Sequence, residues 1–353
     1  MKKLEVGILG ATGMVGQRFV SLIEHHPWFE VAWLGASEKS AGRNYAEACN
    51  WRLREPMPEK ARAMQVHECD PGAHPGKLPQ LMFASLDSKV AGEVEKAFAR
   101  AGHVVVSNSG THRMDEDVPL VIPEVNPDHL ALLRGQQRER KWKGMIVTNP
   151  NCTTVGLVMS LAPLERAFGL DKVIMTSMQA VSGAGYPGIP TLDIMGNVIP
   201  FIGGEEEKVE RETCKLLGMQ RGGRVQPGAF IVSAHCNRVP VEDGHTESIS
   251  VSLKSKASLV DLERVWRTFR ALPQERDLPS APKHPIVVRE ERDRPQLKFD
   301  LMTEGGMATV IGRVRACPVL QFKYTALSHN TIRGAAGAAL LNAELMKSEG
   351  YLD

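Results

Sequence analysis

The chain has 353 residues, 42% hydrophobic and 24% charged, a composition typical of an ordinary soluble protein with room for two domains and unlike that of disordered or fibrous chains. The formal net charge is only +2 and the charges are dispersed, so we expect no nucleic-acid partner. A strand-like segment begins at Leu4 and no apolar run reaches membrane-spanning length, so we expect a cytoplasmic protein with no signal peptide and no membrane partner.

The first part of the chain alternates short apolar segments with amphipathic ones. Predicted strands cover residues 4–9, 29–34, 80–84, 104–107 and 145–148, and predicted helices cover 14–26 and 90–101. Strands that alternate with helices in this way form parallel sheets with helices on both faces. The sequence therefore predicts an α/β fold that begins with a Rossmann-like, doubly wound parallel sheet.

After residue 152 the pattern of predicted elements changes. Strand-like segments follow at 173–181, 229–234, 247–253, 286–288, 309–315 and 321–327, often with alternating polarity, and helices are predicted at 206–217 and 259–272. This pattern indicates an α+β domain with a mixed or antiparallel sheet. The segment 279–298, rich in proline and charge, is predicted to be an exposed loop or arm, and an alanine-rich and glycine-rich helix is predicted at 330–348.

A glycine turn joins the first predicted strand to the first predicted helix. Gly10, Gly13 and Gly16 are spaced Gly-x-x-Gly-x-x-Gly, one residue longer than the commonest dinucleotide fingerprint. In this context Gly10 permits the tight turn, Gly13 lets a pyrophosphate approach the backbone, and Gly16 lets the helix pack closely on the strand. The turn therefore predicts a dinucleotide site.

The cofactor type depends on the residues after the second predicted strand. Ser37 and Ser40, together with Lys39 and Arg43, favour the 2′-phosphate of NADP. Glu38 in the same loop is the kind of residue that binds an unphosphorylated ribose, so NAD stays open.

Cys152 follows a predicted buried strand and opens a predicted helix, in the string Asn149-Pro150-Asn151-Cys152-Thr153-Thr154. A helix N-terminus offers backbone N–H donors and the positive end of a dipole, and both lower the pKa of a thiol. We therefore expect a reactive thiolate here. The other cysteines are predicted to be free thiols, because the six lack the spacing of a structural zinc site, and no metal is expected: Cys49, Cys69, Cys214, Cys236 and Cys317.

A nucleophile needs polar partners, and several lie downstream. Gln179 ends a predicted strand just before a Ser182-Gly183-Ala184-Gly185 turn, and His245 follows a glycine. An imidazole can act as base and acid in one turnover. Arginine binds carboxylate or phosphate as a fork, so Arg113 and Arg238 are candidate anion sites, although each residue by itself also suits a surface charge. Lys208 fits either a third cation or an exposed helix start.

Taken together, these motifs resemble the aspartate-semialdehyde dehydrogenases, in the branch typical of archaea and fungi, over nearly the whole chain. The matching parts are residues 10–16, 113–120, 123–126, 149–154, 179, 182–185, 204–212, 238–245 and 330–337.

The resemblance implies a role for each matching residue. Cys152 is then the nucleophile, His245 the general acid and base, and Gln179 the residue that orients the acyl group. Arg238 is expected to hold the substrate carboxylate and Glu205 its amino group, while Arg113 and Lys208 hold phosphate. Residues 182–185 and Asn330 are expected to line the nicotinamide site. The full set of expected cofactor contacts is Gly10, Thr12, Gly13, Met14, Val15, Ser37, Ser40, Ser85, Ser182, Gly183, Gly185 and Asn330.

The resemblance also implies a domain plan and an assembly. Residues 1–151, completed by a C-terminal helix within 330–353, are expected to bind the dinucleotide, and residues 152–329 to form the catalytic and dimerisation domain. Members of the family are homodimers or homotetramers. The expected reaction is the reversible, NADP-dependent reduction of L-4-aspartyl phosphate to L-aspartate 4-semialdehyde through a cysteine thioester.

Other functions share parts of this pattern. An N-acetylglutamyl-phosphate reductase or a malonyl-CoA reductase would use the same scaffold with a different acyl pocket. A non-catalytic dinucleotide sensor would need the glycine turn, but it would have no use for Cys152, His245 and two anion-binding arginines together.

Overall fold

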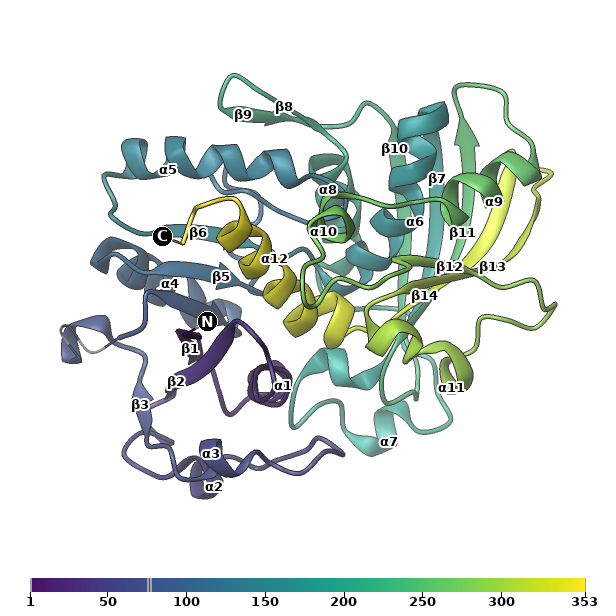
Figure 1. Cartoon of the computed structure of the whole chain (residues 1–353). Helices are drawn as coiled ribbons and strands as arrows, with labels where there is room; N and C mark the ends of the chain where they lie inside the picture. The colour runs from purple at the N-terminus through teal and green to yellow at the C-terminus, as the bar shows by residue number, and fades with distance from the viewer. Residues whose placement is uncertain (1, 75, 77, 353) are drawn as a thin grey trace.

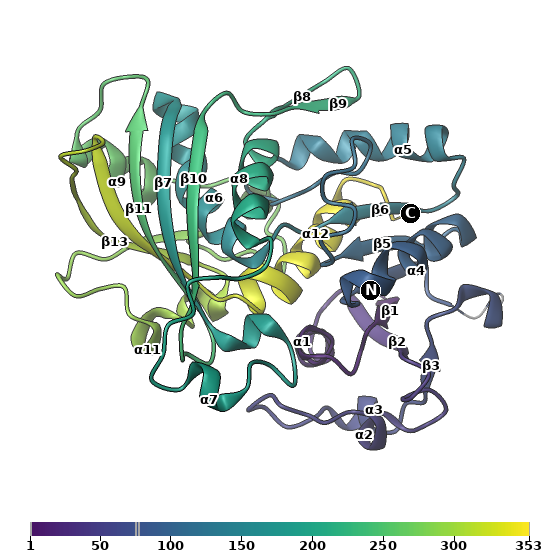
Figure 2. The ribbon, with the colours of Figure 1, turned by 180° about the vertical axis from the view of Figure 1, so that it is seen from behind.

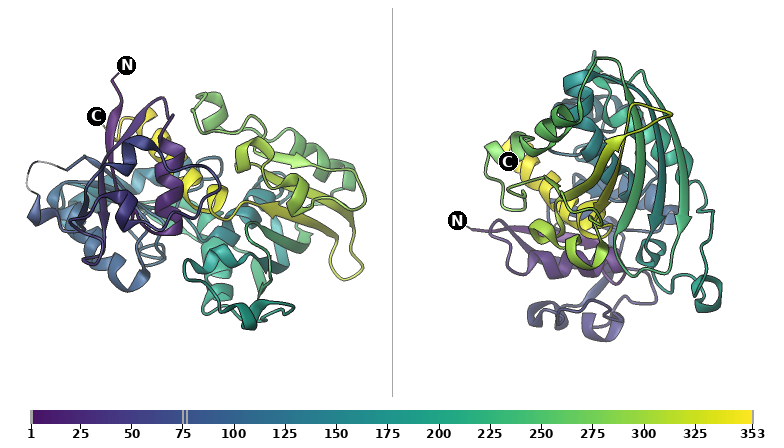
Figure 3. Two further views of the ribbon diagram at one scale, coloured as in Figure 1. Left: turned by 90° about the horizontal axis from the view of Figure 1, so that it is seen from below. Right: turned by 90° about the vertical axis from the view of Figure 1, so that its right-hand side faces the viewer.

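Two lobes make up the computed structural model, which describes residues 2–74, 76 and 78–352 (Figure 1). The first residue and the last residue of the expected domain ranges, 1 and 353, lie outside this description. The C-terminal segment lies between the two lobes, as the view from below in Figure 3 shows. Among the described residues, no helix is long and apolar enough to cross a bilayer.

The first lobe is built on a parallel sheet whose strand order is β3-β2-β1-β4-β5-β6. Successive strand residues face two different cores. Leu81 and Phe83 pack in the core under α1 (Met14–Ile23), whereas Met82 packs with Phe98 of α4 (Ser88–Ala101). Strands buried on both faces read as continuous apolar runs. The predicted doubly wound sheet is therefore confirmed; its strands are β1 (Leu4–Leu9), β2 (Phe29–Ala36), β3 (Val66–Glu68), β4 (Leu81–Ala84), β5 (Val104–Ser107) and β6 (Met145–Thr148).

The second lobe contains a mixed sheet with the order β10-β7-β11-β14-β13-β12. The pairs β10/β7 and β12/β13 are parallel and the other neighbours are antiparallel, so the predicted mixed sheet is also confirmed. Its strands are β7 (Leu170–Gln179), β10 (Ile231–Arg238), β11 (His245–Leu253), β12 (Ile286–Val288), β13 (Thr309–Ala316) and β14 (Phe322–Ser328).

One face of the second sheet is covered by helices, and the other is bare as far as the described residues are concerned. The covering helices are α6 (Cys152–Phe168) and α9 (Leu259–Arg267), while α8 (Glu205–Leu216) runs beside the edge strand β10. Figure 2 looks onto the uncovered face. The alternating pattern of β7 and β10 leaves Ile174, Met178 and Ile231 exposed there, with 43%, 37% and 63% of their surface accessible.

The C-terminal segment returns from the second lobe to the first. After β14 the chain forms a π-helical turn, Ile332–Ala336, and then α12 (Gly337–Ser348), whose apolar side chains join the core beneath α1. Gly334 lies against the start of α6, because a Cβ atom there would stand 2.7 Å from that of Cys152. The predicted final helix is thus present, and its first turn is shaped by contact with the helix that carries the cysteine.

Some predicted elements differ from the structure. The helix expected at 259–272 ends at Arg267, and a separate short helix, α10 (Leu272–Glu275), follows. Most of segment 279–298 lies outside helices and strands, as predicted for a loop, but it is not a free arm, because the predicted strand β12 pairs with β13 and Ser280 binds the buried carboxylate of Glu344. Elements not predicted are β3, α5 (Leu132–Arg140), the hairpin of β8 (Met219–Arg221) and β9 (Arg224–Gln226), and the short helices α2 (Tyr45–Ala48), α3 (Glu59–Arg62), α7 (Thr191–Ile194) and α11 (Leu297–Asp300).

Candidate active site

The candidate nucleophile stands where the two lobes join. β6 ends at Thr148 and is followed directly by Asn149. Cys152, three residues after Asn149, is the first residue of α6. The side-chain oxygen of Asn151 accepts hydrogen bonds from the N–H groups of Thr153 and Thr154, at 2.9 and 3.3 Å. Asparagine is a preferred residue at this position because it satisfies donors that have no partner within the helix. Asn151 therefore fixes the turn that presents the thiol.

His245 is brought to Cys152 by the second sheet. Its Nε2 lies 3.2 Å from the Sγ of Cys152, although 93 residues separate the two in sequence. The N–H of Ala180 donates to Nδ1 at 3.2 Å, which holds the ring plane. With Nδ1 accepting, the neutral ring carries its proton on Nε2 and presents it to the sulfur.

The electrostatic setting of this pair differs from the prediction. Burial, followed by the nearby Glu205 carboxylate, raises the pKa of the Cys152 thiol to about 12, whereas Arg113, Arg238 and the N–H of Thr153 act in the opposite direction. Burial, followed by Arg238, lowers the pKa of His245 to about 3. The expected lowering of the thiol pKa is therefore wrong. The helix N-terminus does stabilise a thiolate, but the loss of solvent outweighs it.

Three predicted residues form one row across the sheet. Arg238 on β10 pairs with Gln179 on β7, and Gln179 pairs with His245 on β11. Arg238 and Gln179 are 5% and 1% exposed, and their polar ends bind the carbonyl of Ala180 at 2.6 Å and the hydroxyl of Ser177 at 3.1 Å. The register thus places a cation, an amide and an imidazole side by side next to the sulfur.

The turn at 182–185 closes over this row. A Cβ atom on Gly183 would lie 3.0 Å from Nη1 of Arg238 and 3.5 Å from Cε1 of His245, so glycine gives the loop its close approach. Asn330 joins this turn to the loop before His245, because its Nδ2 donates to Ser182 Oγ at 2.8 Å and its Oδ1 accepts from the N–H of Gly244 at 2.7 Å.

α8 begins at Glu205, and its orientation decides which of the three consecutive glutamates faces the site. Glu205 is 6% exposed and accepts from Asn151 Nδ2 at 2.9 Å, and Lys208 Nζ lies 3.7 Å from its other oxygen. Glu206 instead caps the edge of β10 by accepting from the N–H of Cys236 at 2.9 Å. Of the three, Glu205 is the residue that faces the nucleophile.

Arg113 is buried, and Glu212 links it to the turn at Asn151. Its Nη1 contacts Glu212 Oε1 at 3.0 Å and its Nη2 donates to the carbonyl of Asn108 at 2.7 Å. Glu212 and Lys215 are functional candidates that the sequence analysis missed. Their helical spacing from Glu205, seven and ten residues, would have placed all three charges on one face of α8.

The glycine turn has the predicted geometry. Gly10 has a φ of +83°, which favours glycine, and a Cβ on Gly16 would stand 2.2 Å from the carbonyl oxygen of Gly10. Gly13 is open by comparison, since its Cβ would meet no atom closer than 3.5 Å. Ser85 packs on the turn through its hydroxyl, whereas Ser37 and Ser40 lie after the end of β2.

A cavity of about 500 Å³ lies between the glycine-turn helix and the second lobe. Met14 and Arg18 of α1 line one side, and Ser182, Asp243 and His329 line the other. Thr12, Val15 and Gly185 lie within the two glycine-containing segments that flank it. The cavity and the turn together leave room for an elongated ligand between the two lobes.

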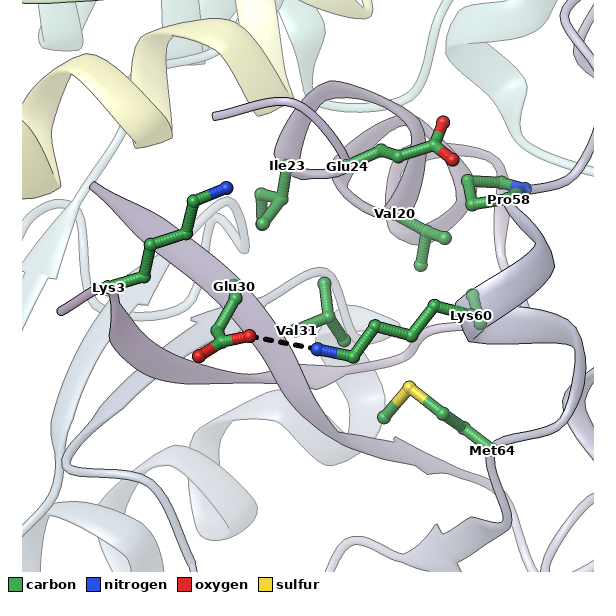
Figure 4. A pocket seen from close by; sticks show the side chains of 10 residues that line it. Lys3, Val20, Ile23, Glu24, Glu30, Val31, Pro58, Lys60 and Met64 are labelled. Atoms are coloured by element: carbon green, nitrogen blue, oxygen red, sulfur yellow. Dashed lines mark hydrogen bonds and ion pairs between the residues drawn. The ribbon is translucent and has the colours of Figure 1, made fainter. Parts of the chain in front are cut away.

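A separate cavity of about 240 Å³ lies on the outer side of the first lobe (Figure 4). It is lined by α1, β2 and α3, and an ion pair of 2.9 Å between Lys60 and Glu30 crosses it. None of the candidate site residues lines this cavity, so it carries no part of the chemistry considered above.

Known proteins of one enzyme family are similar to this chain over nearly its whole length. A family profile described as the NAD binding domain of semialdehyde dehydrogenase matches residues 5–133, and one described as its dimerisation domain matches residues 161–333. The aspartate-semialdehyde dehydrogenase of Methanothermobacter thermautotrophicus is 50% identical over 345 residues, which cover 97% of this chain and 99% of that protein. That of Cryptococcus neoformans is 45% identical over 359 residues, covering 99% and 98%. The crystal structure of the Candida albicans enzyme with NADP has a TM-score of 0.91 and 40% identity, covering 99% of both chains.

Proposed function

We propose that this chain, which belongs to the aspartate-semialdehyde dehydrogenase family, reduces L-4-aspartyl phosphate to L-aspartate 4-semialdehyde with NADPH, in the route to lysine, threonine and methionine. The reaction is reversible. The observation that carries the proposal is the 3.2 Å contact between Cys152 Sγ and His245 Nε2 at the start of α6, beside two buried arginines.

In the reductive direction, the sulfur of Cys152 attacks the acyl carbon, so that a C–S bond forms as the C–O bond to phosphate breaks. The thiol proton leaves with the phosphate. Because Nε2 of His245 already carries a proton, it cannot accept the thiol proton, which leaves with the phosphate. We therefore assign His245 to stabilising the developing thiolate through Nε2–H and to donating that proton to the sulfur when the C–S bond breaks and the aldehyde leaves. Because the thiol is neutral at rest, attack requires the proton to depart as the C–S bond forms. Covalent catalysis divides one difficult transfer into two easier ones.

Substrate recognition follows from the row of residues beside the sulfur. Arg238 is assigned to the α-carboxylate and Gln179 to the acyl oxygen. Glu205 is assigned to the amino group, which needs an anionic partner. Arg113 and Lys208 are assigned to phosphate, because a guanidinium fork matches phosphate oxygens and an ammonium adds a second positive charge.

NADP is the cofactor we assign to the cavity between the lobes. The positive φ of Gly10, the open backbone at Gly13 and the serines after β2 fit its phosphates, and residues 182–185 with Asn330 fit its nicotinamide end. When bound, NADPH supplies the hydride that reduces the thioester. Residues 1–151 with the C-terminal helix form the cofactor domain in this proposal, and residues 152–329 form the catalytic domain.

The bare face of the second sheet is the surface we assign to a second copy of the chain. It belongs to the segment that matches the dimerisation profile, and it exposes Ile174, Met178 and Ile231. Apolar side chains grouped on one face mark an interface. Ile231→Asp should weaken the dimer at least about tenfold in sedimentation. Val260→Asp, on the helix-covered side, is the matched control and should leave the dimer intact.

We place the protein in the cytoplasm, where its six free thiols stay reduced.

The deciding experiment measures reduction of each nicotinamide with L-aspartate 4-semialdehyde and inorganic phosphate. We expect turnover that needs phosphate and prefers NADP to NAD. The same assay with N-acetylglutamate semialdehyde, and with malonate semialdehyde plus coenzyme A, tests the two related reductases. Turnover of either at the rate expected for aspartate semialdehyde would contradict the proposal.

A further inference from the structure

Glu212 is a buried carboxylate that the mechanism above does not use. It lies two turns after Glu205 on the inner face of α8 and is 1% exposed. Its Oε1 contacts Nη1 of Arg113 at 3.0 Å, and its Oε2 accepts from the backbone N–H of Asn151 at 2.6 Å. One side chain thus touches both the arginine assigned to phosphate and the residue that caps the nucleophile helix.

The same face of α8 also holds the backbone that follows Arg113. The ammonium group of Lys215 donates to the carbonyl oxygens of Arg113, Asp115 and Val118, at 2.7, 2.8 and 2.9 Å. A buried ammonium with three carbonyl partners is fully satisfied, so this loop has little freedom to move away from α8. The position of Arg113 is therefore set from two directions, at its backbone and at its guanidinium.

We propose that Glu212 is a positioning residue that joins the phosphate site to the turn of the nucleophile, an inference that rests on the proposed function for the role of Arg113. Both groups that Glu212 binds are donors, so it must offer two acceptor oxygens. A carboxylate does so, whereas an amide of the same shape offers one oxygen and one NH₂ group.

The guanidinium of Arg113 retains a donor for a ligand. With Nη1 on Glu212 and Nη2 on Asn108, its buried Nε has no hydrogen-bond partner among the described residues. A phosphate oxygen is a suitable acceptor for this group. Glu212 therefore fixes the plane of the fork and with it the position of the remaining guanidinium donors, and the same carboxylate fixes the N–H of Asn151, one residue before Cys152.

The test compares Glu212→Gln with Glu207→Gln, an exposed glutamate on the same helix, in the full chain. Cys152 is alkylated with iodoacetamide at increasing concentrations of inorganic phosphate, and steady-state kinetics give separate KM values for phosphate and for the aldehyde. In Glu212→Gln, we expect protection by phosphate to require about ten times more phosphate and the KM for phosphate to rise by the same factor, because one charge-assisted contact is lost. The KM for the aldehyde should change less than about twofold, and Glu207→Gln should match the wild type.

Unchanged phosphate protection in a folded Glu212→Gln protein would overturn the inference, as would an equal loss of affinity for aldehyde and phosphate. If Glu212→Gln does not fold, Glu212→Asp provides the same readout, since it keeps the charge but cannot span both donors. Failure of the proposed function shows separately, as a wild-type protein that turns over no aspartate semialdehyde, while the alkylation experiment still reports whether Glu212 couples anion binding to the thiol.

Discussion

The two six-stranded sheets contribute different things to the site. The parallel sheet contributes backbone, in the form of a glycine turn at the end of β1. This turn depends on the φ of +83° at Gly10 and on the absence of side chains. The mixed sheet contributes side chains: Arg238, Gln179 and His245, aligned across three neighbouring strands. The first sheet is buried on both faces, and the second has a bare face that we assign to a second copy.

The two halves of the site are therefore sensitive to different kinds of substitution. A backbone site tolerates no added atom at its tightest points, whatever the chemistry of the atom. A side-chain site tolerates changes of volume but not of functional group. Four predictions test this contrast, ordered from the largest expected effect to the smallest.

Replacement of the nucleophile should abolish turnover and leave the fold intact. Cys152→Ser removes the polarisable sulfur but keeps its size, so we expect the phosphate-dependent rate to fall by at least about a thousandfold. Circular dichroism should show an unchanged thermal transition. Cys317→Ser, remote from the site, is the control and should retain the wild-type rate. Near-normal turnover of Cys152→Ser would remove the chemical role assigned to the side-chain half.

The pH dependence of thiol alkylation follows from the pKa shifts. The pKa of Cys152 is raised to about 12, so the reactive thiolate is a minor species at neutral pH. Below that pKa its population rises about tenfold for each pH unit. We expect the rate of iodoacetamide alkylation in the ligand-free protein to increase about a hundredfold between pH 7 and pH 9. A plateau below pH 8 would show that the arginines and the helix N-terminus outweigh burial after all.

The glycine turn offers two substitutions with different expected effects. Gly13→Ala adds a methyl group that meets no atom closer than 3.5 Å, so the fold should be retained while NADP affinity falls about tenfold, because the backbone is no longer open to a pyrophosphate. Gly16→Val places a side chain 2.2 Å from the carbonyl oxygen of Gly10 and should destabilise the fold itself. Calorimetric titration and thermal unfolding separate the two effects. Equal affinities for wild type and Gly13→Ala would show that this turn does not hold the pyrophosphate.

The smallest expected effect concerns a buried acid behind the catalytic pair. Glu247 on β11 is 1% exposed, neither of its oxygens has a hydrogen-bond partner among the described residues, and burial raises its pKa well above the ordinary value. The folded protein therefore keeps a proton that the unfolded chain releases above about pH 4.3, so stability falls as pH rises.

Glu247→Gln removes this titration. We expect the variant to gain on the order of 1 kcal/mol in the free energy of unfolding relative to the wild type at pH 8, and less at pH 5. Urea unfolding at both pH values measures the difference, with the exposed Glu207→Gln as the control. A gain that does not grow with pH would show that Glu247 is ionised in the folded protein.

Much of the first lobe could be predicted from the sequence because its determinants are local. Apolar runs such as residues 81–84 and 104–107 specify strands buried on both faces, and the spacing of Gly10, Gly13 and Gly16 specifies a turn between a strand and a helix. β3 and α5 were missed, since three residues of strand and a strongly polar helix leave little hydrophobic periodicity.

The sequence predicted which candidate residues lie together, but not their electrostatics. Cys152, His245, Gln179 and Arg238 all lie together, as their residue types and the family resemblance indicated. The pKa of the thiol was predicted in the wrong direction, because a helix N-terminus can be recognised in sequence whereas desolvation by distant segments cannot. Glu212 and Lys215 were missed because polar residues in an apparently exposed helix look like solvated charges.

The sequence by itself determined the order and type of the main elements, the glycine turn, and the identity of the residues able to act as nucleophile, acid and anion fork. These properties depend on short stretches of chain and on side-chain chemistry. Only the tertiary structure decided that an imidazole 93 positions along the chain lies 3.2 Å from the sulfur, that the pair is neutral at rest, and that α8 turns Glu205 and Glu212 inward. Strand register, burial and charge proximity arise only when distant segments pack, because each is a relation between residues rather than a property of any one of them.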